Sequence, residues 1–264
     1  MDFLEPITLG QIANFVWPLC RISAFIMTMF VVGGNSVPMM VRALISLALT
    51  LCMLPSIPAV ASDLMPFSGL GILITIKESL IGVAIGFMTS FIAQSFTIAG
   101  QAIAMQTGLG FASLVDPVSG TNSPVVGQFF TVLCTLVFFC VDGHLIFFRM
   151  VLISFETMPI GGPFFNSDNL HALVYFGTLM FQCALTMSLS AICTMLVVNF
   201  TLGVMTKASP QLNIFSLGFA ITMIVGILVL NASMNAFMAN FTTNFNNLLE
   251  NTCKLINTSC QGLL

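Results

Sequence analysis

Few side chains in this sequence are of types that do chemistry, and Asp142 and His144 form the pair whose spacing comes closest to a site. An aspartate and a histidine two residues apart could bind a metal or relay protons. His171 is the one other histidine in the sequence, and no second pair of ligands lies at metal-binding spacing. Gly143, between the two side chains, favours a structural break or cap in a helix instead. We therefore expect no catalytic residue, no metal and no cofactor.

Arg21, Lys77 and Glu78 lie inside long apolar runs, where a charged side chain is costly. Arg21 either extends its long side chain to a membrane interface or meets a partner across a helix interface. Lys77 and Glu78 are neighbours that point about 100° apart on a helix, so they cannot simply face each other. Unless this helix end is solvated, each has a different partner in another helix or another subunit. We expect inter-helix or inter-subunit polar contacts at these three residues and at Asp142 and His144.

The eight cysteines could in principle pair with one another or bind metal. Most of them lie within apolar runs, where cysteine behaves as a small hydrophobic side chain. No Cys-x-x-Cys motif occurs in the sequence. Cys253 and Cys260 are seven residues apart, which on one helix separates them by about 10 Å, too far for a disulfide. We expect neither a redox role nor a disulfide at this pair.

The composition is that of a polytopic membrane protein. The chain has 264 residues, of which 58% are hydrophobic and 6% charged, and its mean hydropathy is +1.07. A soluble domain has about a quarter of its residues charged. The length fits about six spans of about 20 residues in an all-α fold, with membrane lipid around it and no separate soluble domain. The net charge of -3 is spread out, so we expect no binding of nucleic acid.

The expected elements are hydrophobic, kinked helical segments. The first follows Asp2 and Glu5 without a basic region or a cleavage site, which indicates an uncleaved span. Gly82 and Gly86 form a Gly-x-x-x-Gly pattern that permits close helix approach. Apolar residues at helical spacing in the Asn-rich tail predict a further amphipathic helix from about residue 241, docking on a partner or a membrane surface. The spans cover about residues 12–32, 39–60, 70–98, 125–155, 170–205 and 214–238.

A loop at residues 106–124 is the longest interruption in the first two-thirds of the sequence. Its glycines and prolines prevent a regular helix, yet several of its side chains are apolar and favour burial. Bare backbone is not tolerated in lipid, so such a loop must pack in protein or line a cavity. We interpret it as a plug or gate loop. The candidate gate residues are Gly108, Leu109, Gly110, Phe111, Val115, Asp116 and Pro117.

The few basic residues give a weak signal of orientation. Placing Arg42 and Lys207 in the cytoplasm puts both termini in the periplasm. The turn with Lys207, Pro210 and Gln211 is then cytoplasmic, as is the side from which the loop at 106–124 departs. Arg149 opposes this arrangement unless an acid such as Glu156 pairs with it.

Several short motifs, taken in order along the chain, resemble the FliR/SctT family of type III secretion export-gate proteins. No single motif is specific, but the ordered set is, and it runs along essentially the whole chain. The set is closer to the flagellar branch of the family than to the injectisome branch. The motifs are Phe15–Arg21, Lys77–Glu78 with Leu80–Gly82, Gly108–Ala112 with Asp116–Pro117, Asp142–Leu145, Met158–Gly161 and Ser209–Phe215.

The resemblance implies a fold, partners and a place in the cell. It implies one export-gate domain over residues 1–264, with a FliP-like part at about 1–169 and FliQ-like helices at about 170–264. Members of the family join FliP and FliQ in a helical assembly that passes unfolded flagellar substrates across the bacterial inner membrane. FlhB wraps the cytoplasmic side of that assembly in the flagellar basal body. The resemblance also implies that the loop at 106–124 seals the pore.

Three other functions fit parts of the pattern. An injectisome export-gate subunit shares the architecture. A secondary transporter would need internal repeats and a charged midplane site near broken helices, for which Lys77, Glu78, Asp142 and His144 are available, but no clear repeat is visible. An intramembrane enzyme would need a nucleophile with its base, or a metal set, and the two histidines have no partners at such spacing.

Overall fold

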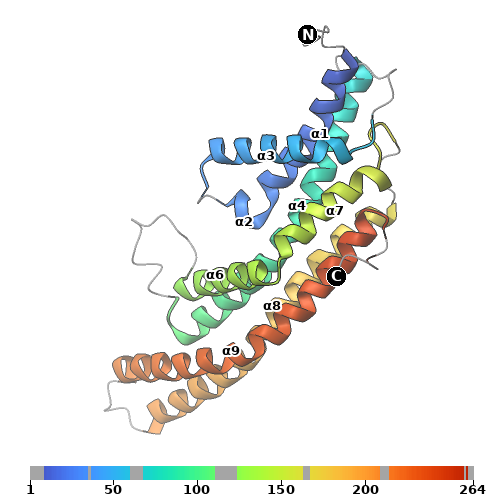
Figure 1. The fold of residues 1–264 in the computed structure, drawn as a ribbon. Coiled ribbons are helices and arrows are strands. Elements are labelled where there is room, and N and C mark those ends of the chain that lie inside the picture. The colour runs from blue at the N-terminus through green and yellow to red at the C-terminus, as the bar shows by residue number, and fades with distance from the viewer. Residues whose placement is uncertain are drawn as a thin grey trace. The chain divides into compact units, whose positions relative to one another are not determined.

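The computed structural model describes residues 9–34, 37–59, 68–110, 124–162, 167–208, 214–258 and 260, and in these ranges every regular element is a helix. The all-α prediction is therefore confirmed for the described part of the chain (Figure 1). The elements are α1 Leu9–Thr28, α2 Phe30–Gly33, α3 Met39–Met53, the 3-10 helix η1 Leu54–Ser56, α4 Gly69–Thr107, α6 Val125–Cys140, α7 Gly143–Thr157, α8 Ser167–Ala208 and α9 Ile214–Leu255.

The described part has fewer candidate membrane spans than the six predicted. Four helical segments are long and apolar enough to cross a bilayer, and a fifth is added if α6 and α7 are counted as one broken span. The predicted first span falls short because the helix is interrupted at Met29, whose backbone is extended, so its apolar part is only Ile12–Thr28. The prediction of about six spans is corrected to four or five within the ranges that the structure describes.

The three longest helices extend well beyond their predicted ends. α4 has 39 residues, and α8 and α9 have 42 each. At 1.5 Å per residue these lengths are about 60 Å, roughly twice the hydrocarbon thickness of a bilayer. The separate amphipathic helix predicted for the tail is instead the continuation of α9, because no glycine or proline interrupts residues 239–255. Helices of this length need protein or water, as well as lipid, along their sides.

α3 turns its apolar side outward. Ser46 and Thr50 are buried, and the exposed residues on the same helix include Met39, Met40 and Leu44. A helix of a soluble protein has the reverse arrangement, with its apolar stripe toward the core. The polar residues are satisfied locally, because their hydroxyls donate to carbonyl oxygens one turn back in the same helix. α3 is thus suited to an apolar environment, either lipid or another subunit.

The described helices divide between two compact units, and each is considered by itself. Unit 1 comprises residues 1–91, 138–176 and 248–264. It contains α1 and the first half of α4, which approach closely. A Cβ atom on Gly82 would overlap the carbonyl oxygen of Arg21, and one on Gly86 would overlap Oγ1 of Thr28. The Gly-x-x-x-Gly pattern therefore permits backbone contact between the two helices, as predicted.

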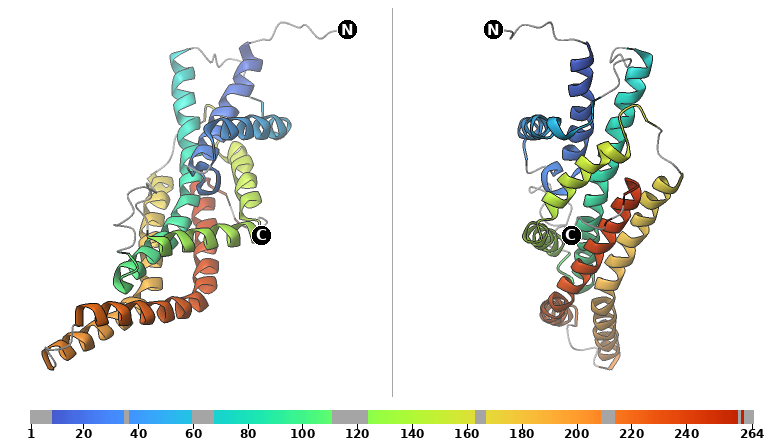
Figure 2. Two further views of the ribbon diagram at one scale, coloured as in Figure 1. Left: turned by 90° about the vertical axis from the view of Figure 1, so that its left-hand side faces the viewer. Right: turned by 45° about the vertical axis from the view of Figure 1, so that its right-hand side comes forward.

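Unit 2 comprises residues 92–137 and 177–247. Phenylalanine rings join its helices. The ring centroid of Phe96 in α4 lies 4.8 Å from that of Phe237 in α9, and Phe130 in α6 lies 6.0 Å from the same ring. Within this unit α8 and α9 run side by side as a helical hairpin (Figure 2). Asn244 on α9 donates from Nδ2 to Sγ of Cys183 on α8 at 2.7 Å, which ties the two helices together.

The boundary between α6 and α7 is a sharp bend of 68°. Asp142 there has a left-handed backbone, with φ 54°. Its carbonyl oxygen accepts the first hydrogen bonds of α7, from the amides of Leu145 and Ile146. Gly143 has no side chain because the ring of Phe138 occupies the space that a Cβ atom would need. The predicted structural break at Asp142–Gly143 is thus confirmed, and aspartate tolerates the left-handed conformation better than most residues.

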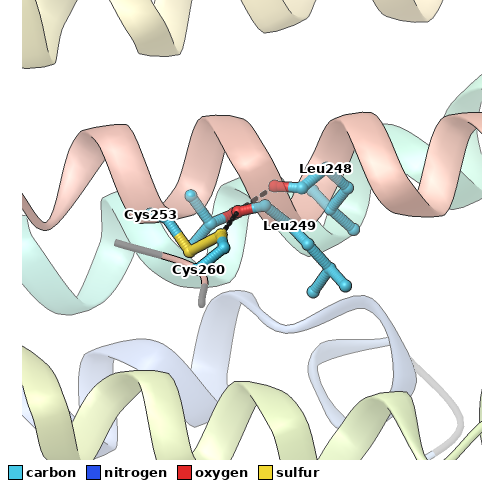
Figure 3. The surroundings of a disulfide bond; sticks show 5 residues. Leu248, Leu249, Cys253 and Cys260 are labelled. Atoms are coloured by element: carbon cyan, nitrogen blue, oxygen red, sulfur yellow. Dashed lines mark hydrogen bonds between the residues drawn. A yellow bond between two sulfur atoms is a disulfide. The ribbon is translucent and has the colours of Figure 1, made fainter. Parts of the chain in front are cut away.

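A disulfide joins Cys253 and Cys260, so the prediction that these two cysteines lie too far apart is wrong (Figure 3). That prediction assumed one helix through both residues. α9 instead ends at Leu255, and Asn257 has a left-handed backbone with φ 53°. The amide of Thr258 donates to the carbonyl of Cys253, the reversal found at many helix C-termini. The chain folds back, and the two Cα atoms lie 5.9 Å apart.

Adding a methyl group at Gly82 tests the close approach of α1 and α4. Gly82→Ala is expected to lower the free energy of unfolding by about 1–3 kcal/mol, because the new Cβ has to displace the backbone of α1. Thermal unfolding of the detergent-solubilised chain can be followed by Trp17, the single tryptophan. Trp17 is fully buried in α1, and its Nε1 donates to Oγ1 of Thr75 in α4 at 3.2 Å.

Gly177→Ala is the matched control, since nothing lies within 4 Å of its Cβ position on α8. This substitution is expected to raise the stability by about 0.5–1 kcal/mol through helix propensity alone. Equal transitions for the two variants would contradict the close contact.

Candidate functional site

Arg21 and Glu78 form an ion pair that is completely buried in unit 1. Arg21 lies in the middle of α1 and Glu78 in the first half of α4, and both side chains are 0% exposed. Nε of Arg21 donates to Oε2 of Glu78 at 2.6 Å, and Nη2 lies 2.5 Å from the same oxygen. Of the two alternatives for Arg21, the structure has the partner across a helix interface. The pair is a charge-assisted contact between two helices in an apolar surrounding.

α7 supplies the remaining acceptors for Arg21. Nη1 donates to the carbonyl oxygen of Ser154 at 2.8 Å and to its hydroxyl at 3.0 Å, and Nη2 donates to the carbonyl oxygen of Met158 at 2.8 Å. The ring of Phe155 lies under the guanidinium, 4.1 Å from Cζ to the ring centroid. One arginine therefore joins α1, α4 and the C-terminal end of α7, using the planar fork of donors that arginine alone provides.

Lys77 has a different partner from its neighbour Glu78. Its Nζ donates to the carbonyl oxygen of Gly162 at 2.7 Å, in the turn after α7, and its side chain is 7% exposed. Glu78 keeps one buried oxygen, Oε1, without a hydrogen bond to any described residue. The two neighbours thus contact separate parts of unit 1, as their directions on a helix require.

Asp142 and His144 do not come together into a site. Asp142 is exposed at the bend, and His144 is half-buried, with its ring against Phe139 at 5.1 Å and Phe148 at 6.4 Å. No hydrogen bond joins the two side chains among the described residues, and Nδ1 of His144 is buried without a partner there. No group of three metal-ligating side chains occurs in the described ranges. The chain therefore bends at Asp142, and the His144 ring packs against phenylalanine rings beside the bend.

The start of the loop at 106–124 lies in unit 2, where it is anchored. Gly108 has φ 78° and ends α4, and the amide of Gly110 donates to the carbonyl of Ala104 at 2.9 Å. Thr107, the last residue of α4, packs against Gly226 in α9 so closely that a Cβ atom there would overlap it. Leu109 is half-buried and Gly110 buried. Phe111, Val115, Asp116 and Pro117 lie outside the described residues.

The predicted cytoplasmic turn is described only at its beginning. Lys207 is exposed in the last turn of α8, where a cation interacts favourably with the helix dipole. Pro210 and Gln211 lie outside the described residues.

The sequence pointed to the charged residues but not to what they contact. The acceptors at Ser154, Met158 and Gly162 are mostly backbone carbonyl oxygens, which every residue carries and no pattern distinguishes. The hydroxyl of Ser154 within the apolar α7 is the one side-chain signal that could have been used.

Removing one member of the buried pair tests its contribution. Arg21→Met leaves the Glu78 carboxylate buried without a counter-charge, and is expected to destabilise the chain by about 3–5 kcal/mol. The double variant with Glu78→Met is expected to cost less than either single variant, since neither charge remains. Unfolding of the solubilised chain, followed by Trp17 fluorescence, measures all three.

Arg42→Met is the control for loss of an arginine. Among the described residues, the guanidinium of Arg42 donates only to carbonyl oxygens of Gly34 and Val37, in the turn before its own helix, so its loss is expected to cost little. If the destabilising effects of Arg21→Met and Glu78→Met simply added up in the double variant, that result would contradict an energetic coupling between Arg21 and Glu78.

The chain is similar to known export proteins over most of its length. The family described as bacterial export proteins, family 1, matches residues 12–248. The flagellar biosynthetic protein FliR of Escherichia coli (strain K12) is 36% identical over 220 residues, which cover 83% of this chain and 84% of the relative. FliR of Bacillus subtilis (strain 168) is 26% identical over 246 residues, which cover 92% and 94%. FliR of Pectobacterium carotovorum is 35% identical over 219 residues, which cover 83% of each chain.

These three relatives share the name flagellar biosynthetic protein FliR. The match runs through α1, α4, α7 and most of α9, and so includes the helices that hold Arg21, Lys77 and Glu78. An all-helical membrane chain with a match of this extent belongs to the FliR family of bacterial export proteins, which are not enzymes.

Proposed function

We propose that this chain is a subunit of the flagellar type III protein export gate, where it forms with FliP and FliQ a channel for unfolded flagellar substrates. The observation that carries the proposal is the similarity over residues 12–248 to proteins named for flagellar biosynthesis. The gate lies in the inner membrane at the flagellar basal body. The FliP-like part is residues 1–169, the FliQ-like part is residues 170–264, and FlhB is the partner on the cytoplasmic side.

The exposed apolar surface supports a hetero-oligomeric assembly. On α8 the exposed side chains include Leu185, Leu189 and Phe200, and on α9 they include Ile224 and Leu228. The two helices are about twice as long as a bilayer core is thick, so lipid cannot cover all of this surface. Contiguous apolar surface beyond the bilayer requires protein partners. FliP and FliQ subunits would supply that cover.

The loop at 106–124 is, in this proposal, the plug of the channel. Its described start supports the idea because it is fixed at one end, by Thr107 against Gly226 of α9. The apolar residues Leu109, Phe111 and Val115 would exclude water from the closed pore, as hydrophobic constrictions do. Gly108 and Gly110 would let the segment move aside for a passing chain. Asp116 and Pro117 belong to the same proposed gate segment.

The disulfide supports a periplasmic position for the C-terminal end of α9. Disulfides persist in the periplasm and are rare in the reducing cytoplasm. The other end of α9 follows the turn with Lys207, Pro210 and Gln211, which the basic residue favours as cytoplasmic. FlhB would contact the gate near this turn. We place the N-terminus on the periplasmic side as well.

Deletion of residues Gly110 to Gly120 tests the plug. With the complete export apparatus present, the variant is expected to leak ions and small molecules across the inner membrane, because the apolar seal is gone. Leakage of a small dye and of ions is measured in cells beside export of a flagellar substrate. Replacement of the same residues by a Gly-Ser segment of equal length is the matched variant, and is expected to leak as well.

Co-purification of FliP and FliQ with each variant separates the outcomes. A tight membrane with a fully assembled gate would remove the plug role and leave the chain as a scaffold. Failure of the unaltered chain to co-purify with FliP and FliQ would remove the proposed function itself.

Thiol labelling tests the orientation. In cells denatured without reductant, six cysteines are expected to react with a maleimide, and all eight after reduction. In a strain without the periplasmic disulfide oxidase, Cys253 and Cys260 are expected to react without reductant. Cys193, an exposed free thiol on α8, is the control that is expected to react in both strains without reductant. Free thiols at Cys253 and Cys260 in the oxidase-containing strain would contradict a periplasmic end of α9.

A further inference from the structure

The first half of α4 carries an exposed apolar stripe with the spacing of a helix–helix interface. Leu70, Leu73, Leu80 and Phe87 are 66%, 63%, 43% and 46% exposed. With Lys77 between Leu73 and Leu80, the first steps along the stripe are three, four and three residues, the alternation of a heptad pattern, and Phe87 follows seven residues after Leu80. We call these five residues the α4 seam. The seam lies entirely within unit 1.

A groove of about 430 Å³ lies along the seam. Leu70, Leu73 and Leu80 line it from α4, and Gly161 and Gly162 line it from the turn after α7. Apart from Lys77, its lining side chains are apolar, and the two glycines place no side chains in it. Side chains from a facing helix would insert between those of the seam, as knobs into holes.

Lys77 brings an unbalanced charge to this groove. Its side chain is 7% exposed, and among the described residues its ammonium bonds only to the carbonyl of Gly162. An ammonium has three donors, so two remain. The neighbouring Glu78 is committed to Arg21, with both side chains 0% exposed. Arg21 and Lys77 therefore flank one anion, Glu78, and no described carboxylate forms an ion pair with Lys77. A buried charge without an ion pair is costly.

We propose that the α4 seam binds an apolar helix of a neighbouring gate subunit, and that this helix brings one carboxylate to Lys77. The inference rests on the proposed function, and adds the chemistry of the partner at one face of the chain. The exposed leucines require an apolar occupant, and Lys77 requires an anion at one place along it. A single carboxylate balances the charge and accepts the two remaining donors.

The groove favours a protein helix over a lipid headgroup. A phosphate group needs several donors around its oxygens, and Lys77 is the one charged donor along the groove. The amide of Gly162 is already committed to the carbonyl of Pro159. The alternating spacing of Leu70, Leu73, Lys77 and Leu80 also matches a facing helix better than an acyl chain. A polar residue at one position of such a seam fixes the register of the partner helix.

Photo-crosslinking in the complete export apparatus tests the proposal. A benzoylphenylalanine at Leu73 is expected to form an adduct with a helix of another subunit, within about one turn of an aspartate or glutamate. Ile72 is the matched control, because it is 60% exposed but points about 100° away from Leu73 on the same helix. Peptide mass spectrometry of the adduct identifies the partner and its acidic residue.

Charge variants in the same background test the role of Lys77. Lys77→Met is expected to reduce the Leu73 adduct about tenfold, and Lys77→Arg to retain it, because loss of a buried counter-charge weakens the contact. Lys77→Glu is expected to abolish the adduct, and a lysine in place of the acidic residue of the partner helix is expected to restore it.

Four results would overturn the proposal while FliP and FliQ still co-purify with the chain. They are an adduct with phospholipid, an adduct with a second copy of this chain, an adduct with a helix that has no acidic residue within reach, and an undiminished adduct in Lys77→Met. Loss of co-purification of the unaltered chain would instead refute the proposed function on which the inference rests.

Discussion

Burial of the Arg21–Glu78 pair is the constraint on which unit 1 depends. An arginine in an apolar run cannot remain there without a counter-charge and acceptors for its other donors. Glu78 supplies the first, and the end of α7 supplies the second through the carbonyls of Ser154 and Met158. Three helices far apart in sequence must therefore meet at one guanidinium. The glycines of α4 make this possible, because they let the backbone of α1 come within reach.

This closed arrangement disfavours a transporter site at the Arg21–Glu78 pair. A transporter site has to expose its charged groups to substrate or ion in at least one state. Arg21 and Glu78 are instead fully buried, with the ring of Phe155 and the backbone of α7 against the guanidinium. No hydrogen bond joins Asp142 to His144 in the described ranges. The charged side chains of Arg21 and Glu78 hold helices together, while the apolar side chains of α3, α4, α8 and α9 include many that are exposed. Such an outward apolar surface suits lipid and the partner subunits proposed above.

The sequence predicted the helical class, the importance of the buried charged residues and the break at Asp142, because each of these features depends on composition or on residue type. It did not predict the partners of Arg21 and Lys77, since every residue carries the same backbone carbonyl. The span count failed at Met29, where one extended residue interrupts an apolar run that has no obvious breaker. The disulfide was missed because the left-handed backbone of Asn257 reverses the chain, and asparagine only weakly signals that conformation.

Three residues with left-handed backbones end or bend helices in the described part, and they differ in what holds them. Asn257 is closed by the disulfide, and Asp142 by the hydrogen bonds that begin α7 and by Gly143 against Phe138. Glycine adopts left-handed and right-handed backbone conformations without steric cost, so the residue type at Gly108 does not fix the end of α4. Its position depends on contacts in unit 2, chiefly Thr107 against Gly226 and the amide of Gly110 on Ala104. A disulfide thus fixes the chain reversal at Asn257, and steric contact fixes the bend at Asp142. The end of α4, next to the loop at 106–124, is held by packing and one hydrogen bond. The plug role proposed for that loop would suit this weaker kind of attachment, because a segment that opens and closes has to come from the less stable parts of a fold.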